Sequence, residues 1–194
     1  MHYAKKHGTR IAVVNPMREY GLERYWVPSV ATSALFGTKL MDDFFQVRVG
    51  GDIAFINGVI KTLIALNRVD QEFIAKRTTG YEELKAALGA QSWEMLEERS
   101  GLSRQEMERF ALLYGHARSA VFVYSMGLTQ HEFGVDNVKA VVNLALSRGM
   151  LGRDKCGIMP IRGHSGVQGA ASAGRAGQVP RRISSQRRKR PPLL

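Results

Sequence analysis

The fold is decided by the stretch FQVRVGGDIAFINGVIKTLI, residues 45–64. Its first five residues alternate between apolar and polar side chains, which predicts a half-buried strand over residues 45–49. Gly50-Gly51-Asp52 then opens a pattern whose apolar residues recur at helical spacing as far as Ile64. The stretch therefore predicts a strand, a tight turn and a helix, which is a building unit of α/β folds.

Two apolar runs elsewhere predict further strands that end in loops. Ile11-Ala12-Val13-Val14 stops at Asn15-Pro16, and a second run over residues 120–124 is followed by a loop at 125–130 and a helix over 135–146. Loops at the carboxyl ends of such strands are where α/β folds bind ligands. We therefore expect an α/β fold with a largely parallel sheet.

A helical insert is predicted in the middle of the chain. Apolar spacing and glycine punctuation indicate four helices, over residues 71–76, 81–88, 92–98 and 104–116. Ser103 and Glu106 have the spacing of a capping box at the start of the last one. Residues 15–45 predict a long irregular excursion, and the glycine-dense stretch over 149–169 predicts a loop that a ligand can approach closely.

The positive charge is concentrated at one end of the chain. The 194 residues carry a formal charge of +11, but residues 170–194 hold seven Lys and Arg and no acid, so removing these seven charges leaves residues 1–169 with +4. The tail has few large apolar residues and is expected to be disordered. Its basic run between Arg181 and Arg190 makes a non-specific nucleic-acid binder one alternative, although an isolated run of this kind seldom indicates a dedicated recognition fold.

Cysteine content and hydropathy bound the location of the protein. Cys156 is the single cysteine, which excludes an internal disulfide framework or a zinc or iron–sulfur site built from cysteines of this chain. No apolar run reaches the length of a membrane span or a signal peptide. We expect a cytoplasmic protein with no membrane partner.

Four motifs follow one another in order along the chain. They are Val13-Val14-Asn15-Pro16, Gly51-Asp52-Ile53-Ala54, Met126-Gly127-Leu128-Thr129-Gln130 and residues 160–169. Together they resemble the alpha subunit of formate dehydrogenase-like molybdopterin oxidoreductases. The resemblance implies that residues 1–169 form part of a cofactor-binding region with Rossmann-like lobes, incomplete relative to the full family fold. It also implies a cofactor of two molybdopterin guanine dinucleotides with one molybdenum or tungsten ion, a small anionic substrate such as formate, and an electron-transfer partner.

Asp52 has two readings. After two glycines and before a helix, it has the position of an ordinary N-cap that accepts amide hydrogen bonds. The resemblance implies instead that its carboxylate binds guanine, whose N1–H and N2–H donors suit a charge-assisted bidentate contact.

Other cofactor-binding candidates follow the strands predicted over residues 11–14 and 120–124. The family more often reads Asp-Pro-Arg where this chain reads Asn15-Pro16-Met17-Arg18; the resemblance gives Asn15 a contact to ribose or base and Arg18 a contact to pyrophosphate. Their alternatives are a turn residue and a solvated arginine. Gly127, Thr129 and Gln130 are assigned to the pterin, with an ordinary helix-entry loop as the alternative.

The last motif carries the catalytic candidates. The resemblance places Arg162 near the metal, where a fixed positive charge attracts an anion and stabilises the transition state. His164 stands where some formate dehydrogenases have glutamine, and the remaining cofactor contacts are assigned to Gly163, Ser165 and Gln168. The alternative for His164 is a loop histidine that satisfies backbone groups.

The iron–sulfur cysteines and the metal-ligating cysteine or selenocysteine of the family have no counterpart in this sequence. We therefore expect the chain alone to be inactive, the product of a truncated reading frame with a frameshifted tail. A rival hypothesis is a non-catalytic module that binds a guanine nucleotide or assists assembly and carries no metal.

Overall fold

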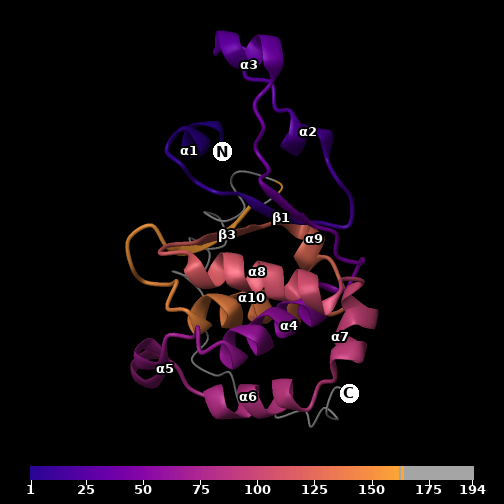
Figure 1. The fold of residues 1–194 in the computed structure, drawn as a ribbon, viewed down its shortest axis with the longest axis vertical. Helices are drawn as coiled ribbons and strands as arrows, with labels where there is room; N and C mark the ends of the chain where they lie inside the picture. Colours follow the sequence, from indigo (N-terminus) through magenta and orange to yellow (C-terminus); the bar gives the residue numbers. More distant parts are fainter. Residues whose placement is uncertain (162, 164–194) are drawn as a thin grey trace, which may run out of the picture. The chain divides into compact units, whose positions relative to one another are not determined.

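The computed structural model describes residues 1–161 and 163, and Met1–Pro160 form one compact unit. Figure 1 shows short strands packed on a group of helices. The elements in chain order are α1 (His2–Lys6), β1 (Ala12–Val14), α2 (Tyr20–Glu23), α3 (Ala31–Phe36), β2 (Asp43–Phe45), α4 (Asp52–Ala65), α5 (Gln71–Arg77), α6 (Tyr81–Gly89), α7 (Trp93–Ser100), α8 (Arg104–His116), β3 (Val121–Tyr124), α9 (Met126–Thr129), α10 (Gly134–Ser147) and β4 (Gly157–Pro160).

The strands form two parallel pairs. β1 pairs with β2, with Val13 opposite Phe44, and β3 pairs with β4, with Phe122 opposite Ile158. Parallel partners require a crossover between them, and the crossovers here contain α2 and α3 in the first pair and α9 and α10 in the second. The prediction of an α/β fold with parallel strand pairing is confirmed, although the described strands form two small sheets and helices dominate.

Helix α4 lies at the centre of the core. It packs against α6, α7, α8 and α10. Its side chains Val59, Ile60 and Leu63 are at most 1% exposed. Full burial of one such side chain is worth about 1.5–3 kcal/mol, so this helix is a main source of stability. The predicted helix through Ile64 is confirmed.

The helical insert is confirmed at α5 to α8. Asp70 and Ser92 cap α5 and α7 by accepting hydrogen bonds from backbone amides three residues on. At α8 the predicted capping box is present, because the Ser103 hydroxyl accepts from the Glu106 amide while the Glu106 carboxylate accepts from the Ser103 amide. These side chains satisfy amides that the first helical turn leaves without partners.

The predicted strand over residues 45–49 is wrong, because β2 ends where that prediction begins. The Arg48 amide donates to the Ser100 carbonyl oxygen at 2.7 Å, at the end of α7. This contact takes the chain away from β1 and toward the helical insert. Val47 is 1% exposed and fills the core as a single buried residue, so the alternating pattern marks a buried loop.

Three regions predicted as irregular contain regular structure. The excursion over residues 15–45 includes α2, α3 and β2, the loop at 125–130 includes α9, and the glycine-dense stretch includes β4. Each of these elements has three to six residues. Such short segments show no periodicity, and a parallel strand depends on partners distant in sequence.

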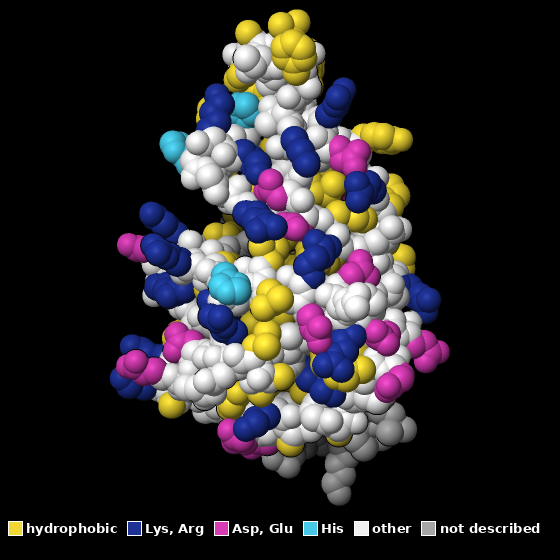
Figure 2. Space-filling view, in the orientation of Figure 1, with side chains coloured by type: hydrophobic (Ala, Val, Ile, Leu, Met, Phe, Trp, Pro, Cys, Tyr) yellow, Lys and Arg dark blue, Asp and Glu magenta, His cyan; other side chains and the backbone are white. Residues whose placement is uncertain are grey.

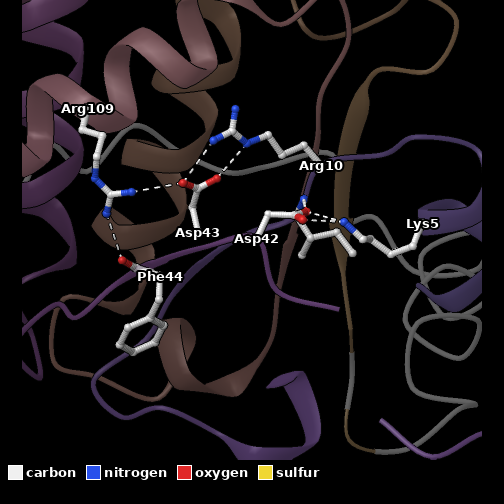
Figure 3. A network of polar contacts seen from close by, with 7 residues as sticks. Lys5, Arg10, Asp42, Asp43, Phe44 and Arg109 are labelled. Atoms are coloured by element: carbon white, nitrogen blue, oxygen red, sulfur yellow. Dashed lines mark hydrogen bonds and ion pairs between the residues drawn. The ribbon is translucent and has the colours of Figure 1, made fainter. Parts of the chain in front are cut away.

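Ion pairs hold the beginning of β2 against its neighbours (Figure 3). The Asp43 carboxylate lies between two arginines, 2.8 Å from Arg10 Nε and 3.1 Å from Arg109 Nη1. Arg109, on α8, also donates to the Phe44 carbonyl oxygen, and its guanidinium lies 4.0 Å from the centre of the Phe45 ring. These contacts link α8 to β2 and stabilise the amino end of the first strand pair.

Within residues 1–161 and 163, no helix has the length and apolar character needed to span a lipid bilayer.

The entry of α4 is fixed by a close backbone approach at Gly51. A methyl group there would lie 2.6 Å from the Arg99 carbonyl oxygen and 2.8 Å from Ser100 Cα. Because backbone atoms cannot give way as a flexible side chain does, Gly51→Ala is expected to lower the free energy of unfolding by about 1–3 kcal/mol in urea titrations. Gly89→Ala, in open space at the end of α6, is the matched control and should leave stability unchanged or raise it by up to about 1 kcal/mol. Equal stability of the two variants would contradict the packing described.

Candidate functional site

The carboxyl ends of β1 and β2 are joined by hydrogen bonds. The Asn15 amide donates to the Phe45 carbonyl oxygen at 3.1 Å, and Gln46 Nε2 donates to the Pro16 carbonyl oxygen at 3.1 Å. Asn15 Nδ2 donates to the Met17 carbonyl oxygen at 2.7 Å and to Glu19 Oε1 at 3.1 Å. Asn15 therefore acts as a turn residue through its amide nitrogen, and its side-chain oxygen is the group suited to accept a ligand hydrogen bond.

Arg18 lies on an aromatic ring beside an acid. Its guanidinium is 4.9 Å from the centre of the Phe44 ring, and Nη1 is 2.9 Å from Glu23 Oε1. It lines a hollow of about 620 Å³ to which two further cations, Arg24 and Lys39, and two acids, Glu23 and Asp42, also contribute. The side chain is thus held in place, and the hollow is lined by three cations and two carboxylates.

Asp52 is the first residue of α4, and the N-cap position belongs to Gly51. The alternative reading of Asp52 as the N-cap is therefore excluded. Burial raises the pKa of the Asp52 carboxyl above its ordinary value, and this effect exceeds the opposing effects of its own amide and of the charge on His131. A half-buried carboxylate at the beginning of a helix is suited to accept strong donors from a ligand.

The segment after β3 is held by the beginning of α10. Asn137, which is 2% exposed, donates through Nδ2 to the Leu128 carbonyl oxygen at 2.9 Å. Gly134 allows the close approach, since a methyl group there would collide with the Thr129 carbonyl. Gly127, Thr129 and Gln130 are exposed, and Gln130 Nε2 lies 3.5 Å from Met126 Sδ. The segment is a short helix whose polar side chains remain accessible.

The predicted residues form two local neighbourhoods. Asn15 lies with the end of β2, whereas Asp52 lies within electrostatic range of His131, the residue that follows Gln130. Sequence reasoning missed Gln46, His131 and Asn137. For Asn137, the available signal was an amide side chain on the apolar stripe of the predicted helix. For His131, it was the position directly after a candidate motif.

The last motif falls largely beyond the region described. Arg162, His164, Ser165 and Gln168 lie outside the described residues, and Gly163 is described as exposed. Their predicted roles stay predictions. Among the residues that the structure does describe, no group of three or more His, Cys, Asp or Glu side chains gathers to hold a metal ion.

The known proteins that this chain resembles in sequence are longer than the chain itself. No family model matches it. It is 38% identical over 181 residues to Protein YdeP of Escherichia coli, covering 87% of this chain and 24% of that protein. It is also 38% identical over 171 residues to F420-dependent formate dehydrogenase 1 subunit alpha of Methanococcus maripaludis, covering 88% of this chain and 23% of that subunit. The chain thus spans about a quarter of the length of the curated relatives it matches.

A solved structure supports the likeness at the level of fold. Acetylene hydratase from Pelobacter acetylenicus superimposes with a TM-score of 0.66 at 20% sequence identity, over 79% of this chain and 19% of that one. Identity at this level shows a shared fold. The evidence for homology comes from the relatives found by sequence, which are 38% identical to this chain.

The raised pKa of Asp52 predicts a pH dependence of stability. The folded state holds a proton on this carboxyl at pH values where the unfolded chain has released it, so the stabilising contribution is complete at low pH and is lost as pH rises from the ordinary value of 3.8 through the folded pKa. Asp52→Asn removes the burial cost, and urea titrations should show its stability gain over the parent growing from pH 3 to pH 7. Asp136→Asn, in the first turn of α10, is the matched control, and we expect no such gain from it. A pH-independent difference for Asp52→Asn would contradict the inferred burial cost.

Proposed function

This chain is a homologue of the formate dehydrogenase alpha subunits, and on that premise we propose that it forms part of a guanine-dinucleotide cofactor site in a molybdopterin-dependent oxidoreductase. The homology to formate dehydrogenases over 88% of this chain is the observation that carries the proposal. The position and environment of Asp52 support it from the side of the structure.

The residues present fit a guanine nucleotide in their chemistry. Guanine offers two adjacent N–H donors, and the Asp52 carboxylate offers two acceptor oxygens in a partly desolvated setting where such bonds are strong. The Asn15 side-chain oxygen can accept from a ribose hydroxyl, since its amide nitrogen is already engaged. Arg18 and its neighbours Arg24 and Lys39 supply positive charge for a pyrophosphate.

We propose that Gly127, Thr129, Gln130, Gly163, Ser165 and Gln168 complete the contacts to the cofactor. The exposed side chains on and after α9 support this for Thr129 and Gln130, because Asn137 and Gly134 hold their backbone in one place. When bound, a bis-molybdopterin guanine dinucleotide with molybdenum or tungsten supplies two-electron redox chemistry.

Arg162 and His164 are proposed as the catalytic residues. A fixed guanidinium attracts a small anion such as formate and stabilises charge in the transition state, while an imidazole can hold or move a proton at its ring nitrogens. The proposal also includes a small anionic substrate, an electron-transfer partner and an iron–sulfur cluster. We propose these for a protein of the length of the relatives, not for this chain alone.

Guanine selectivity provides the test. The purified chain is expected to bind GDP more tightly than ADP in isothermal titration calorimetry, because adenine lacks the paired donors that a carboxylate reads. Asp52→Asn should weaken GDP binding by about tenfold to a hundredfold, the range expected for hydrogen bonds to a charged group, and should reduce the preference over ADP.

Asp136→Asn is the control for a carboxylate in a first helical turn outside the proposed site, and should keep GDP affinity. Equal affinity for GDP and ADP, or GDP binding that Asp52→Asn leaves intact, would contradict the assignment. Metal analysis of the same preparation tests the redox proposal separately. Bound molybdenum or tungsten would support it, whereas GDP binding by metal-free protein would favour the rival nucleotide-binding module.

A further inference from the structure

A second hollow lies between α1 and α3 and has a basic lining. Its volume is about 430 Å³. Figure 2 shows Lys, Arg and His side chains in the upper part of the molecule, below the hydrophobic side chains of the α3 region. The residues that line the hollow are His2, Lys5, Lys6, Thr32, Ser33, Phe36, Gly37, Thr38 and Lys39. No acid occurs in this described lining, although the Lys5 ammonium is paired with Asp42 at 2.6 Å.

A chain of hydroxyl groups runs from the core of this region to His2. Ser33 is 2% exposed; its hydroxyl accepts from the Val27 amide at 3.1 Å and donates to the Tyr25 carbonyl oxygen at 3.2 Å. Ser33 Oγ also lies 2.6 Å from Thr38 Oγ1, which lies 3.0 Å from His2 Nδ1.

The hydroxyl chain sets the direction of each bond. The contacts of Ser33, Thr38 and His2 can all form together only if the Ser33 hydrogen is directed to the Tyr25 carbonyl oxygen, which can only accept, and the Thr38 hydroxyl donates to Ser33. Thr38 Oγ1 therefore accepts from His2, whose Nδ1 carries the proton. This arrangement gives every group in the chain a donor or an acceptor to match, as buried polar groups require.

The consequence falls on the other ring nitrogen. With the proton on Nδ1, the neutral ring presents Nε2 as a hydrogen-bond acceptor, and Nε2 is buried with no partner among the described residues. A buried polar atom without a partner costs free energy, so a donor at this position would be stabilising. The described lining contains lysines and no carboxylate, so it is unsuited to hold a metal ion.

We propose that this hollow binds a protonated oxyanion of the phosphate class. The ammonium groups of Lys6 and Lys39 attract its charged oxygens, and its P–OH group donates to His2 Nε2 as the flexible lysines admit it. Hydrogen phosphate keeps such a proton near neutral pH, whereas sulfate has none. The hollow should therefore discriminate between two ions of nearly equal size.

The test uses inorganic phosphate and sulfate as probes. Calorimetric titration of the full chain at constant ionic strength is expected to show phosphate bound at least about tenfold more tightly than sulfate, which corresponds to one good hydrogen bond with a charged partner. His2→Phe keeps a ring beside Tyr3 but removes both nitrogens, and should lower phosphate affinity about tenfold. His7→Phe, an exposed position at the end of α1, is the matched control and should bind as the parent does.

Two further measurements keep the outcome independent of folding defects in His2→Phe. Lys6→Met should weaken phosphate binding and preserve the preference over sulfate, and ¹⁵N NMR of the parent protein should show His2 protonated at Nδ1. Equal binding of the two ions, absence of phosphate binding at millimolar concentration, or a proton on Nε2 of the neutral ring would each overturn the proposal. Asp52→Asn should leave phosphate binding here unchanged, which separates this inference from the proposed nucleotide site.

Discussion

The burial of α4 is the interaction on which the rest of the structure depends. Its apolar side chains lie against helices on several sides, and its first turn is brought so close to the end of α7 that only glycine fits at residue 51. The contact joins the backbone of Gly51 to the backbone of Arg99 and Ser100, so the position of the first turn has little freedom. Since Asp52 is the first residue of that turn, the packing of the core determines where this carboxylate lies.

The two ends of the β1–β2 pair have different roles. At the amino end, carboxylates are consumed by ion pairs: Asp42 with Lys5, and Asp43 with two arginines, one of them from α8 (Figure 3). At the carboxyl end, the polar groups are the amides of Asn15 and Gln46. Their N–H groups donate to backbone carbonyl oxygens, and their side-chain oxygens are suited to accept hydrogen bonds from a ligand. This division is the one expected for parallel strands, whose carboxyl ends are where ligands bind.

Sequence periodicity predicted the long elements well and the short ones poorly. α4, α8 and α10 were located to within about two residues because each has an apolar stripe over several turns, and caps such as Ser103 mark where they begin. β2 was displaced because Val47 and Val49 continue an alternating pattern, and only the distant Ser100 carbonyl reveals that this stretch leaves the sheet. β4 was missed for the same reason, since its four residues pair with β3 across an entire helix. For the site, the sequence placed Asp52 correctly at the beginning of a helix, but the proximity of His131 to Asp52 depends on packing between segments distant in sequence and could not be predicted.

The placement of Asp52 also bears on why a carboxylate is there at all. An acid in the first turn of a helix is normally stabilising, because the helix dipole and free amides favour negative charge. Here burial raises the pKa of the carboxyl despite its own amide and the nearby His131, so the charged form is held at a cost. A residue chosen for stability alone would be an exposed acid or a neutral cap such as serine, as at α7 and α8. A desolvated carboxylate gains most from a partner that brings its own donors, and that energetic argument supports the binding role proposed for Asp52.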